Sequence, residues 1–214
     1  MERIDAAQLI AFLQVLTEEM PAHRDRLREL DAQLGDGDLG ITIAIGMKAI
    51  RDALADFPGE EPGMILAKSG MAFNREAAST FGAIFATALM SAGKHIRGKD
   101  AIEVGDLPGM VEAAASGVSA RGGARPGEKT ILDVLLPMAK ALEQQVAAGA
   151  SLPAAAQAAH GACVEAVAET EQMEAKHGRG GWLKEKSIGI PDPGSVAICL
   201  MVECLARFVE GQSP

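Results

Sequence analysis

The stretch LDAQLGDGDLGITIAIG, from Leu30 to Gly46, decides which fold class the chain adopts. Its centre, GDGDLG, satisfies the pattern G-x-G-x-x-G, which binds dinucleotides when it follows a β-strand and opens a helix. Here the preceding residues, HRDRLRELDAQL, are charged and have the amphipathic spacing of a helix. The glycine-rich turn therefore joins two helices, and this context argues against an α/β dinucleotide-binding fold.

Apolar residues recur at spacings of three and four on both sides of this turn, as in Leu9, Leu13 and Leu16. This is the period of an α-helix, and no alternating apolar–polar run bounded by turn residues predicts a β-strand. We expect an all-α protein of about eight helices, in which the first two segments can join as one helix kinked at Pro21. The predicted segments are 4–19, 22–33, 40–56, 62–72, 77–95, 106–120, 130–148, 153–175 and 195–210.

Length, composition and charge limit the class of protein further. The chain has 214 residues with 48% hydrophobic content, which predicts a single domain over residues 1–214. A formal net charge of −9 argues against a nucleic-acid partner, which needs a concentrated positive surface. No apolar run approaches the ~20 residues of a membrane span, and the N-terminal segment MERIDAAQLIAFLQ carries charges where a signal peptide is apolar. We expect a cytoplasmic protein without a membrane partner.

Asp31, Asp36 and Asp38 lie within one segment of eight residues that includes the glycine-rich turn. A calcium-binding EF-hand loop that began at Asp36 would have Gly40 and Met47 at positions where it needs ligands, so that motif fails. Carboxylates this close repel one another, and a turn with three glycines that accept positive φ can direct them towards one cation, of which Mg²⁺ or Ca²⁺ suits oxygen ligands. The glycines are Gly35, Gly37 and Gly40.

The residues that follow, Gly40 to Thr42, open the next helix, whose free N–H groups can receive an anion. A metal ion next to a helix N-terminus indicates a phosphate ligand. The alternative is an ordinary turn in which Asp38 caps the helix and binds nothing else.

Two further loops have compositions that favour ligand binding. RGGARPGEKT, Arg121 to Thr130, is one residue longer than a Walker A loop and lacks the preceding strand, yet it can place N–H groups near a nucleotide. In HGRGGWLKEKSIGIPDPGS, His177 to Ser195, Arg179 is a candidate clamp for a phosphate or base. There Asp192 can accept a hydrogen bond from a ribose hydroxyl or a base amine. Helix capping by Thr130, a surface arginine and a plain Asp-Pro-Gly turn are the alternatives.

Read together, these three loops resemble the nucleotide-binding L subunit or domain of dihydroxyacetone kinases, in the same order and over nearly the whole chain. The resemblance implies an antiparallel eight-helix barrel whose loops at one end bind ADP or ATP through two Mg²⁺ ions. It implies Asp31, Asp36 and Asp38 as metal ligands. Phosphate contacts are implied at Leu39, Gly40, Ile41, Thr42, Thr80 and Phe81, and the remaining nucleotide contacts at Gly122, Ile131, Arg179, Asp192, Pro193 and Gly194.

The same resemblance implies a kinase that needs a partner. In the family a separate K subunit holds the short keto-sugar covalently on a histidine, and the L subunit delivers the γ-phosphate. Arg179 or Lys129 would supply further positive charge, and no general base is expected in this chain. A variant of this function uses bound ADP as a cofactor that a phosphocarrier protein recharges.

The sequence departs from the family at two positions near the phosphates. Leu39 stands where the family usually has histidine, and Phe81 stands at the serine of a G-G-x-S-G stretch, whose first two glycines are Ala78 and Ser79 here. Phenylalanine lacks a donor and crowds the backbone approach that glycine allows. Two alternative functions follow, a nucleotide-sensing regulatory module that has lost transfer and a purely structural helical bundle.

Overall fold

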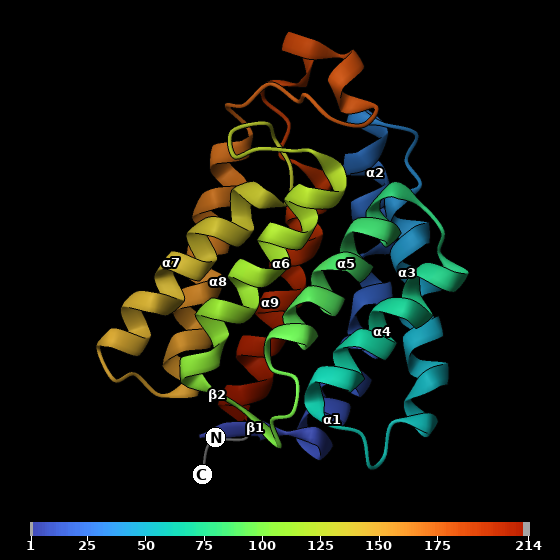
Figure 1. The fold of residues 1–214 in the computed structure, drawn as a ribbon. Coiled ribbons are helices and arrows are strands. Elements are labelled where there is room, and N and C mark those ends of the chain that lie inside the picture. Colours follow the sequence, from blue (N-terminus) through green and yellow to red (C-terminus); the bar gives the residue numbers. More distant parts are fainter. Residues whose placement is uncertain (1, 212–214) are drawn as a thin grey trace.

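Helices form almost all of the computed structural model, which describes residues 2–211 (Figure 1). In chain order they are α1 (Ala6–Glu19), α2 (Arg24–Leu34), α3 (Leu39–Ala53), α4 (Pro62–Glu76), α5 (Thr80–His95), α6 (Leu107–Gly122), α7 (Leu132–Ala147), α8 (Leu152–Thr170) and α9 (Pro193–Gly211). A 3₁₀ turn at Met20–His23 joins α1 to α2 without a loop, and Pro21 lies in its first turn. The predicted kinked helix is therefore confirmed.

The helices close into a ring. From α2 onwards each helix packs against the next one in the chain, α1 packs against α3, and α9 packs against both α1 and α2 (Figure 1). The connections between most neighbours are short, which sets successive helices antiparallel. The predicted all-α barrel is confirmed. Within residues 2–211, none of its helices combines the length and the apolar character that a bilayer span requires.

Local sequence signals explain where most helices begin. Pro62, Pro108 and Pro153 lie in the first turns of α4, α6 and α8, where the missing N–H is not needed. The largest difference from prediction is the end of α8, which lies at Thr170 instead of residue 175. There Thr170 Oγ1 accepts a hydrogen bond from the Asp192 amide at 2.9 Å, so the returning chain covers the helix end.

Glycines allow some helices to approach more closely than side chains would permit. A Cβ atom at Gly46 of α3 would lie 2.2 Å from the ring of Phe73 on α4. Gly63 of α4 and Gly93 of α5 face each other, and a Cβ atom on either would lie within 2.5 Å of the other's carbonyl oxygen. The aromatic-poor interior is therefore filled by close backbone contact as well as by aliphatic side chains.

Two short strands contradict the expectation that no strand would form. β1 (Arg3–Asp5) pairs antiparallel with β2 (Ala101–Glu103), and Ile4 stands opposite Ile102. Both isoleucines are buried against the core. Three residues are too few to show an alternating pattern, so the sequence gives no local signal for them. They lie at the end of the barrel opposite the α8–α9 connection (Figure 1).

Candidate nucleotide and metal site

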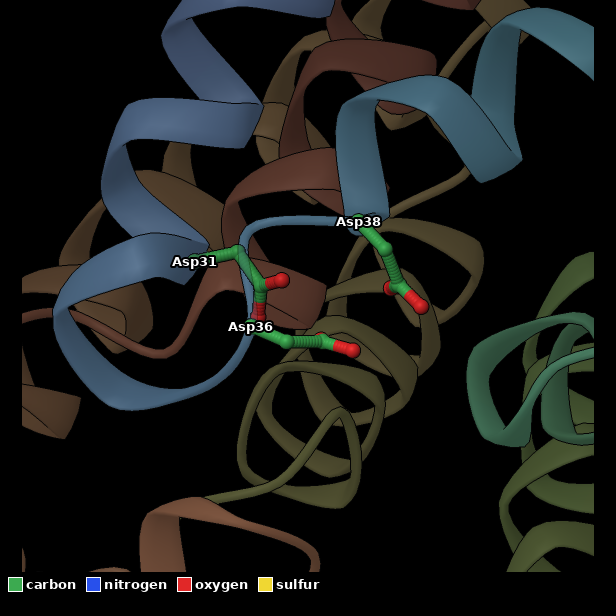
Figure 2. A group of neighbouring side chains, drawn as sticks. All are labelled: Asp31, Asp36 and Asp38. Atoms are coloured by element: carbon green, nitrogen blue, oxygen red, sulfur yellow. The ribbon is translucent and has the colours of Figure 1, made fainter.

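The three predicted metal ligands lie together at one end of the barrel. Asp31 comes from the last turns of α2, Asp36 from the turn, and Asp38 immediately precedes α3. One carboxylate oxygen from each residue lies within 4.8 Å of the others, and Figure 2 shows the side chains directed towards a common space. We call these residues the acid triad. Asp31 is half-buried, whereas Asp36 and Asp38 are exposed.

The three glycines of the turn have different roles, and only one has the predicted positive φ. Gly37 has a φ of 73°, which L side chains rarely adopt. Gly40 instead permits close packing, because a Cβ atom there would lie 2.0 Å from the carbonyl oxygen of Arg24. A Cβ atom at Gly35 would lie 3.0 Å from Oδ1 of Asp31, a tight contact that the Asp31 side chain would have to relieve. Steric fit therefore shapes the turn as much as glycine's freedom at φ.

Asp38 occupies the N-cap position of α3, but its side chain makes no capping hydrogen bond. The carboxylate lies with those of Asp31 and Asp36 instead. Burial raises the pKa of Asp38 above its usual value, and repulsion from Asp36 and Asp31 raises it further. The geometry therefore does not support the alternative in which Asp38 serves only as a helix cap.

Arg179 is the cation that the structure places beside the triad. Its Nη1 forms an ion pair with Oδ2 of Asp36, and its charge partly opposes the rise in the pKa of Asp38. The next residue, Gly180, lies against the end of α2, where a Cβ atom would be 3.7 Å from the carbonyl oxygen of Leu34. The connection between α8 and α9 thus reaches across to the acid triad.

The start of α3 contributes backbone N–H groups next to the triad. The Leu39 amide donates to Oδ2 of Asp31 at 3.3 Å, and the Thr42 amide donates to the Asp38 carbonyl at 2.9 Å. Gly40 and Ile41 are the second and third residues of the helix, positions whose amides have no intrahelical acceptor. The Leu39 side chain is buried in the core.

A second group of predicted residues comes together from three different helices. A Cβ atom at Gly194, in the first turn of α9, would lie 3.1 Å from Ile131 and 3.7 Å from Phe81. Ile131 immediately precedes α7, and Phe81 is in the first turn of α5. The Phe81 ring stacks on Phe85 at a centroid distance of 5.8 Å. Residues far apart in the sequence therefore form one apolar cluster, in which Ile131 is buried and Phe81 is part-exposed.

The other predicted contacts lie around this second group. Thr80 is exposed at the start of α5, where Ser79 caps the helix by accepting from the Gly82 amide at 2.9 Å. Gly122 ends α6, and a Cβ atom there would lie 3.4 Å from Ile84. Pro193 begins α9 and is buried. These placements leave the nucleotide contacts at all three residues as predictions.

Asp192 acts as the cap of α9 in this structure. Its Oδ2 accepts hydrogen bonds from both the amide and the hydroxyl of Ser195, each at 2.7 Å. Burial raises the pKa of Asp192 to about 6, although the bonds from Ser195 oppose that rise. The proposed contact with a ribose or a base stays a prediction.

Lys129 has a structural position instead of the exposed one expected of a phosphate-binding lysine. Its side chain is buried, and its Nζ donates to the carbonyl oxygens of Met173 at 3.1 Å and Ser187 at 2.5 Å. Burial lowers the pKa of Lys129. The suggested role of Lys129 as a source of positive charge at the phosphates is not supported by this geometry, which leaves Arg179 for that role.

Sequence reasoning missed Asp133, which shapes the loop before α7. Its carboxylate accepts from the amides of Gly127 at 2.5 Å and Thr130 at 2.8 Å, while Thr130 Oγ1 accepts from the Leu132 amide at 3.3 Å. The signal was present as Thr130 followed three residues later by an acidic residue, which is a capping-box spacing. It also missed the contact between Glu128 and His177, 2.5 Å apart, which links two of the three loops.

The donor set of the acid triad fits a hard divalent cation. Its side chains offer only carboxylate oxygens, which Mg²⁺ prefers. Arg179 already places a positive charge beside one of them, on Asp36. The amides at the start of α3 suit a phosphate group, and the part-exposed Phe81 ring beside Gly194 suits contact with an apolar or aromatic ring. The arrangement can therefore hold a metal ion, an anion and a base at one end of the barrel.

Comparison with known proteins identifies similar chains. The sequence pattern of the DAK2 domain family matches residues 33–207. The ADP-binding subunit DhaL of the PEP-dependent dihydroxyacetone kinase of Escherichia coli K12 is 29% identical over 203 residues, which cover 95% of this chain and 97% of that protein. The L-erythrulose kinase of Pectobacterium atrosepticum is 32% identical over 194 residues, which cover 90% of this chain and 33% of the kinase.

A solved structure has the same fold. The dihydroxyacetone kinase of C. freundii in complex with AMP-PNP and Mg²⁺ is 25% identical, with a TM-score of 0.71. The match covers 94% of this chain and 34% of that one. The chain thus spans nearly all of the bacterial subunit but about a third of the two longer kinases.

Proposed function

The chain belongs to the DAK2 domain family and is of the DhaL type, and from this premise we propose that it is the nucleotide-binding, phosphoryl-transferring L subunit of a two-component kinase. The acceptor is dihydroxyacetone or a related short keto-sugar, held by a separate K-type subunit. The observation that carries the proposal is the convergence of Asp31, Asp36 and Asp38 beside the start of α3. The names of the relatives, which include an ADP-binding subunit and an erythrulose kinase, support the ligand and the acceptor class.

Each part of the site has a role in this function. The acid triad would hold Mg²⁺, as two ions if it follows the family, and the bound metal would supply charge neutralisation at the phosphates. The amides at Gly40 and Ile41 bind phosphate oxygens, and Arg179 stabilises negative charge with its fork of donors. The part-exposed ring of Phe81, in the apolar cluster with Ile131 and Gly194, receives the base. The chain's own contribution is thus orientation and electrostatic stabilisation, which phosphoryl transfer chiefly requires.

Binding and transfer can be tested separately. Calorimetry with Mg–ADP and with ADP in EDTA should show binding that depends on the divalent ion. The chain is then mixed with the K-type subunit of its own organism and dihydroxyacetone, and phosphate transfer is followed with either ATP or a phosphocarrier system as donor. Metal-independent nucleotide binding, or no binding at all, would contradict the proposal.

A variant of this function uses tightly bound ADP that a phosphocarrier protein recharges. It is favoured by the match to nearly the full length of a subunit named as part of a PEP-dependent kinase. Rapid multiple turnover with ATP as the sole donor would exclude it. Turnover that requires the phosphocarrier and leaves ADP on the protein would support it.

A regulatory module is the second candidate, and two observations favour it. The Leu39 side chain is buried in the core, so it offers no polar contact to phosphate. The Phe81 ring packs on Phe73 and Phe85 where the family has a hydroxyl, at centroid distances of 6.4 and 5.8 Å. Tight Mg–nucleotide binding without transfer to any keto-sugar would identify this function. Restoring the family residues with Leu39→His and Phe81→Ser should then recover transfer.

A further inference from the structure

The guanidinium of Arg179 occupies the position where the acid triad needs positive charge. Its Nη1 forms an ion pair with Oδ2 of Asp36, one of three carboxylates whose ligand oxygens lie within 4.8 Å of one another. The side chains of Arg179 and Asp36 remain 55% and 40% exposed. A divalent ion that enters the triad therefore competes with this arginine for the Asp36 carboxylate.

The fold brings the arginine to this position from a distant part of the sequence. Gly178, with a φ of 59°, turns the chain before Arg179. Gly180 then packs between Ala175 and the end of α2, where a Cβ atom would lie 3.2 Å from the Ala175 Cβ. The backbone at Arg179 is thus held close to the triad, while its long and exposed side chain can change partner.

We propose that Arg179 makes the acid triad select a metal–nucleotide complex over a free metal ion. This inference rests on the proposed function. A free divalent ion displaces the guanidinium and leaves it without an anionic partner. A metal–nucleotide complex displaces it too but brings phosphate oxygens, which the guanidinium can bind with two parallel hydrogen bonds. Arg179 is then a specificity-determining residue that weakens the binding of a free metal ion and strengthens the binding of a metal–nucleotide complex.

Removing the arginine should change the two affinities in opposite directions. In Arg179→Ala, the free ion meets three carboxylates without a competing cation, so Mn²⁺, used as a probe without nucleotide, should bind about three- to tenfold more tightly. Mg–ADP should bind about tenfold or more weakly, because a charge-assisted contact with phosphate is lost. Calorimetry measures both affinities.

Arg207 provides a matched control. It pairs with Glu19, and the two side chains are 56% and 37% exposed, nearly the same as in the Arg179–Asp36 pair. It lies fourteen residues after the start of α9, about 21 Å along the helix at 1.5 Å per residue. Arg207→Ala removes the same charge from an equally exposed ion pair, and neither affinity should change by more than about twofold.

Trp182 reports the exchange of partners without any activity measurement. It is the chain's single tryptophan, its side chain is 82% exposed, and its amide donates to the Arg179 carbonyl at 3.0 Å. Mg–ADP should change the fluorescence of the wild-type protein, and Mn²⁺ alone should do so only at concentrations about three- to tenfold higher than those that fill Arg179→Ala in calorimetry. If Arg179→Ala and the wild type bind Mn²⁺ equally while both bind Mg–ADP, the selection is wrong and the proposed function survives. If the wild type does not bind Mg–ADP, both the selection by Arg179 and the proposed function are wrong.

Discussion

At the scale of single residues, Asp38 shows how this site differs from an ordinary helix start. An aspartate at the N-cap normally accepts a hydrogen bond from the first turn, which stabilises a protein by about 1 kcal/mol. Asp38 makes no such bond, and its pKa is raised by burial and then by the two carboxylates beside it. At this position a capping hydrogen bond is missing and three carboxylates repel one another. This combination is expected at a ligand site and not at a plain turn.

Asp38→Asn should separate stability from ligand binding. The substitution removes repulsion within the acid triad, so the melting temperature without ligand should stay the same or rise. Mg–ADP at 100 times its dissociation constant should stabilise the wild type by about 2.7 kcal/mol and the variant far less. Thermal melts with and without Mg–ADP measure both effects. Asp52→Asn, at an exposed pair with Lys48, is the control and should keep the full ligand shift.

Asp192 predicts a stability that depends on pH. Its pKa of about 6 in the folded protein lies above the usual value near 3.9, so between these values the folded state holds a proton that the unfolded state releases. The contribution of Asp192 to the free energy of unfolding therefore falls as pH rises from about 4 to about 6, and it is constant above that. Because the residue is only partly buried, the fall should be about 1–2 kcal/mol.

Asp192→Asn isolates this contribution, because asparagine also caps helices but does not titrate. Urea unfolding of both proteins at pH 4, 5, 6 and 7 gives the comparison. The wild type should lose stability relative to the variant up to pH 6 and not beyond. A difference between the two proteins that is the same at all four pH values would show that Asp192 has an ordinary pKa.

At the scale of elements, the connection between α8 and α9 is irregular but tightly held. The Ala175 amide donates to Ser187 Oγ at 2.9 Å, and the Gly189 amide donates to the Glu171 carbonyl at 2.7 Å. Lys129 anchors the same segment from the loop before α7. These buried polar contacts fix the backbone that presents Arg179, so the site depends on a loop that is organised before any ligand binds.

Lys129→Met should loosen this connection without moving the barrel. Methionine leaves the carbonyls of Met173 and Ser187 without their donor, which should cost about 1–3 kcal/mol of stability. Hydrogen exchange should accelerate in residues 173–189 and remain slow in the long helices. Mg–ADP binding should weaken, because Arg179 is less well positioned. Lys140→Met, at an exposed position on α7, is the control, and equal exchange rates in the two variants would contradict the role of Lys129.

At the scale of the whole molecule, features encoded locally were predictable and those made by distant contacts were not. Helical periods and proline positions located the helices because each helix buries its own apolar stripe. The acid triad could be predicted because its members lie within eight residues. The pairing of β1 with β2 and the burial of Lys129 could not, because they join segments about 100 and 60 residues apart that carry no mutual signal.

Arg179 illustrates the boundary between the two cases. Its residue type predicted an anionic partner, and in this structure Arg179 pairs with the carboxylate of Asp36, while the predicted phosphate contact stays a prediction. The sequence distance between them conceals the contact, and only the closed ring, which brings the α8–α9 connection over the end of α2, creates it.

Closure of the ring also sets how the barrel tolerates added volume. A Cβ atom at Gly93 would lie 2.3 Å from the carbonyl oxygen of Gly63, and α4 and α5 cannot separate freely because each is also packed against its other neighbour. We therefore expect Gly93→Ala to lower the free energy of unfolding by at least about 2 kcal/mol, as overpacked cores do. Gly161 lies inside α8 with no atom within 4 Å of a Cβ, so Gly161→Ala should instead stabilise the protein by about 0.5–1 kcal/mol through helix propensity. Urea unfolding of both variants measures the contrast. If Gly93→Ala is as stable as Gly161→Ala, the helices of this barrel can slide apart, and the close contact of α4 with α5 is not what holds the wall together.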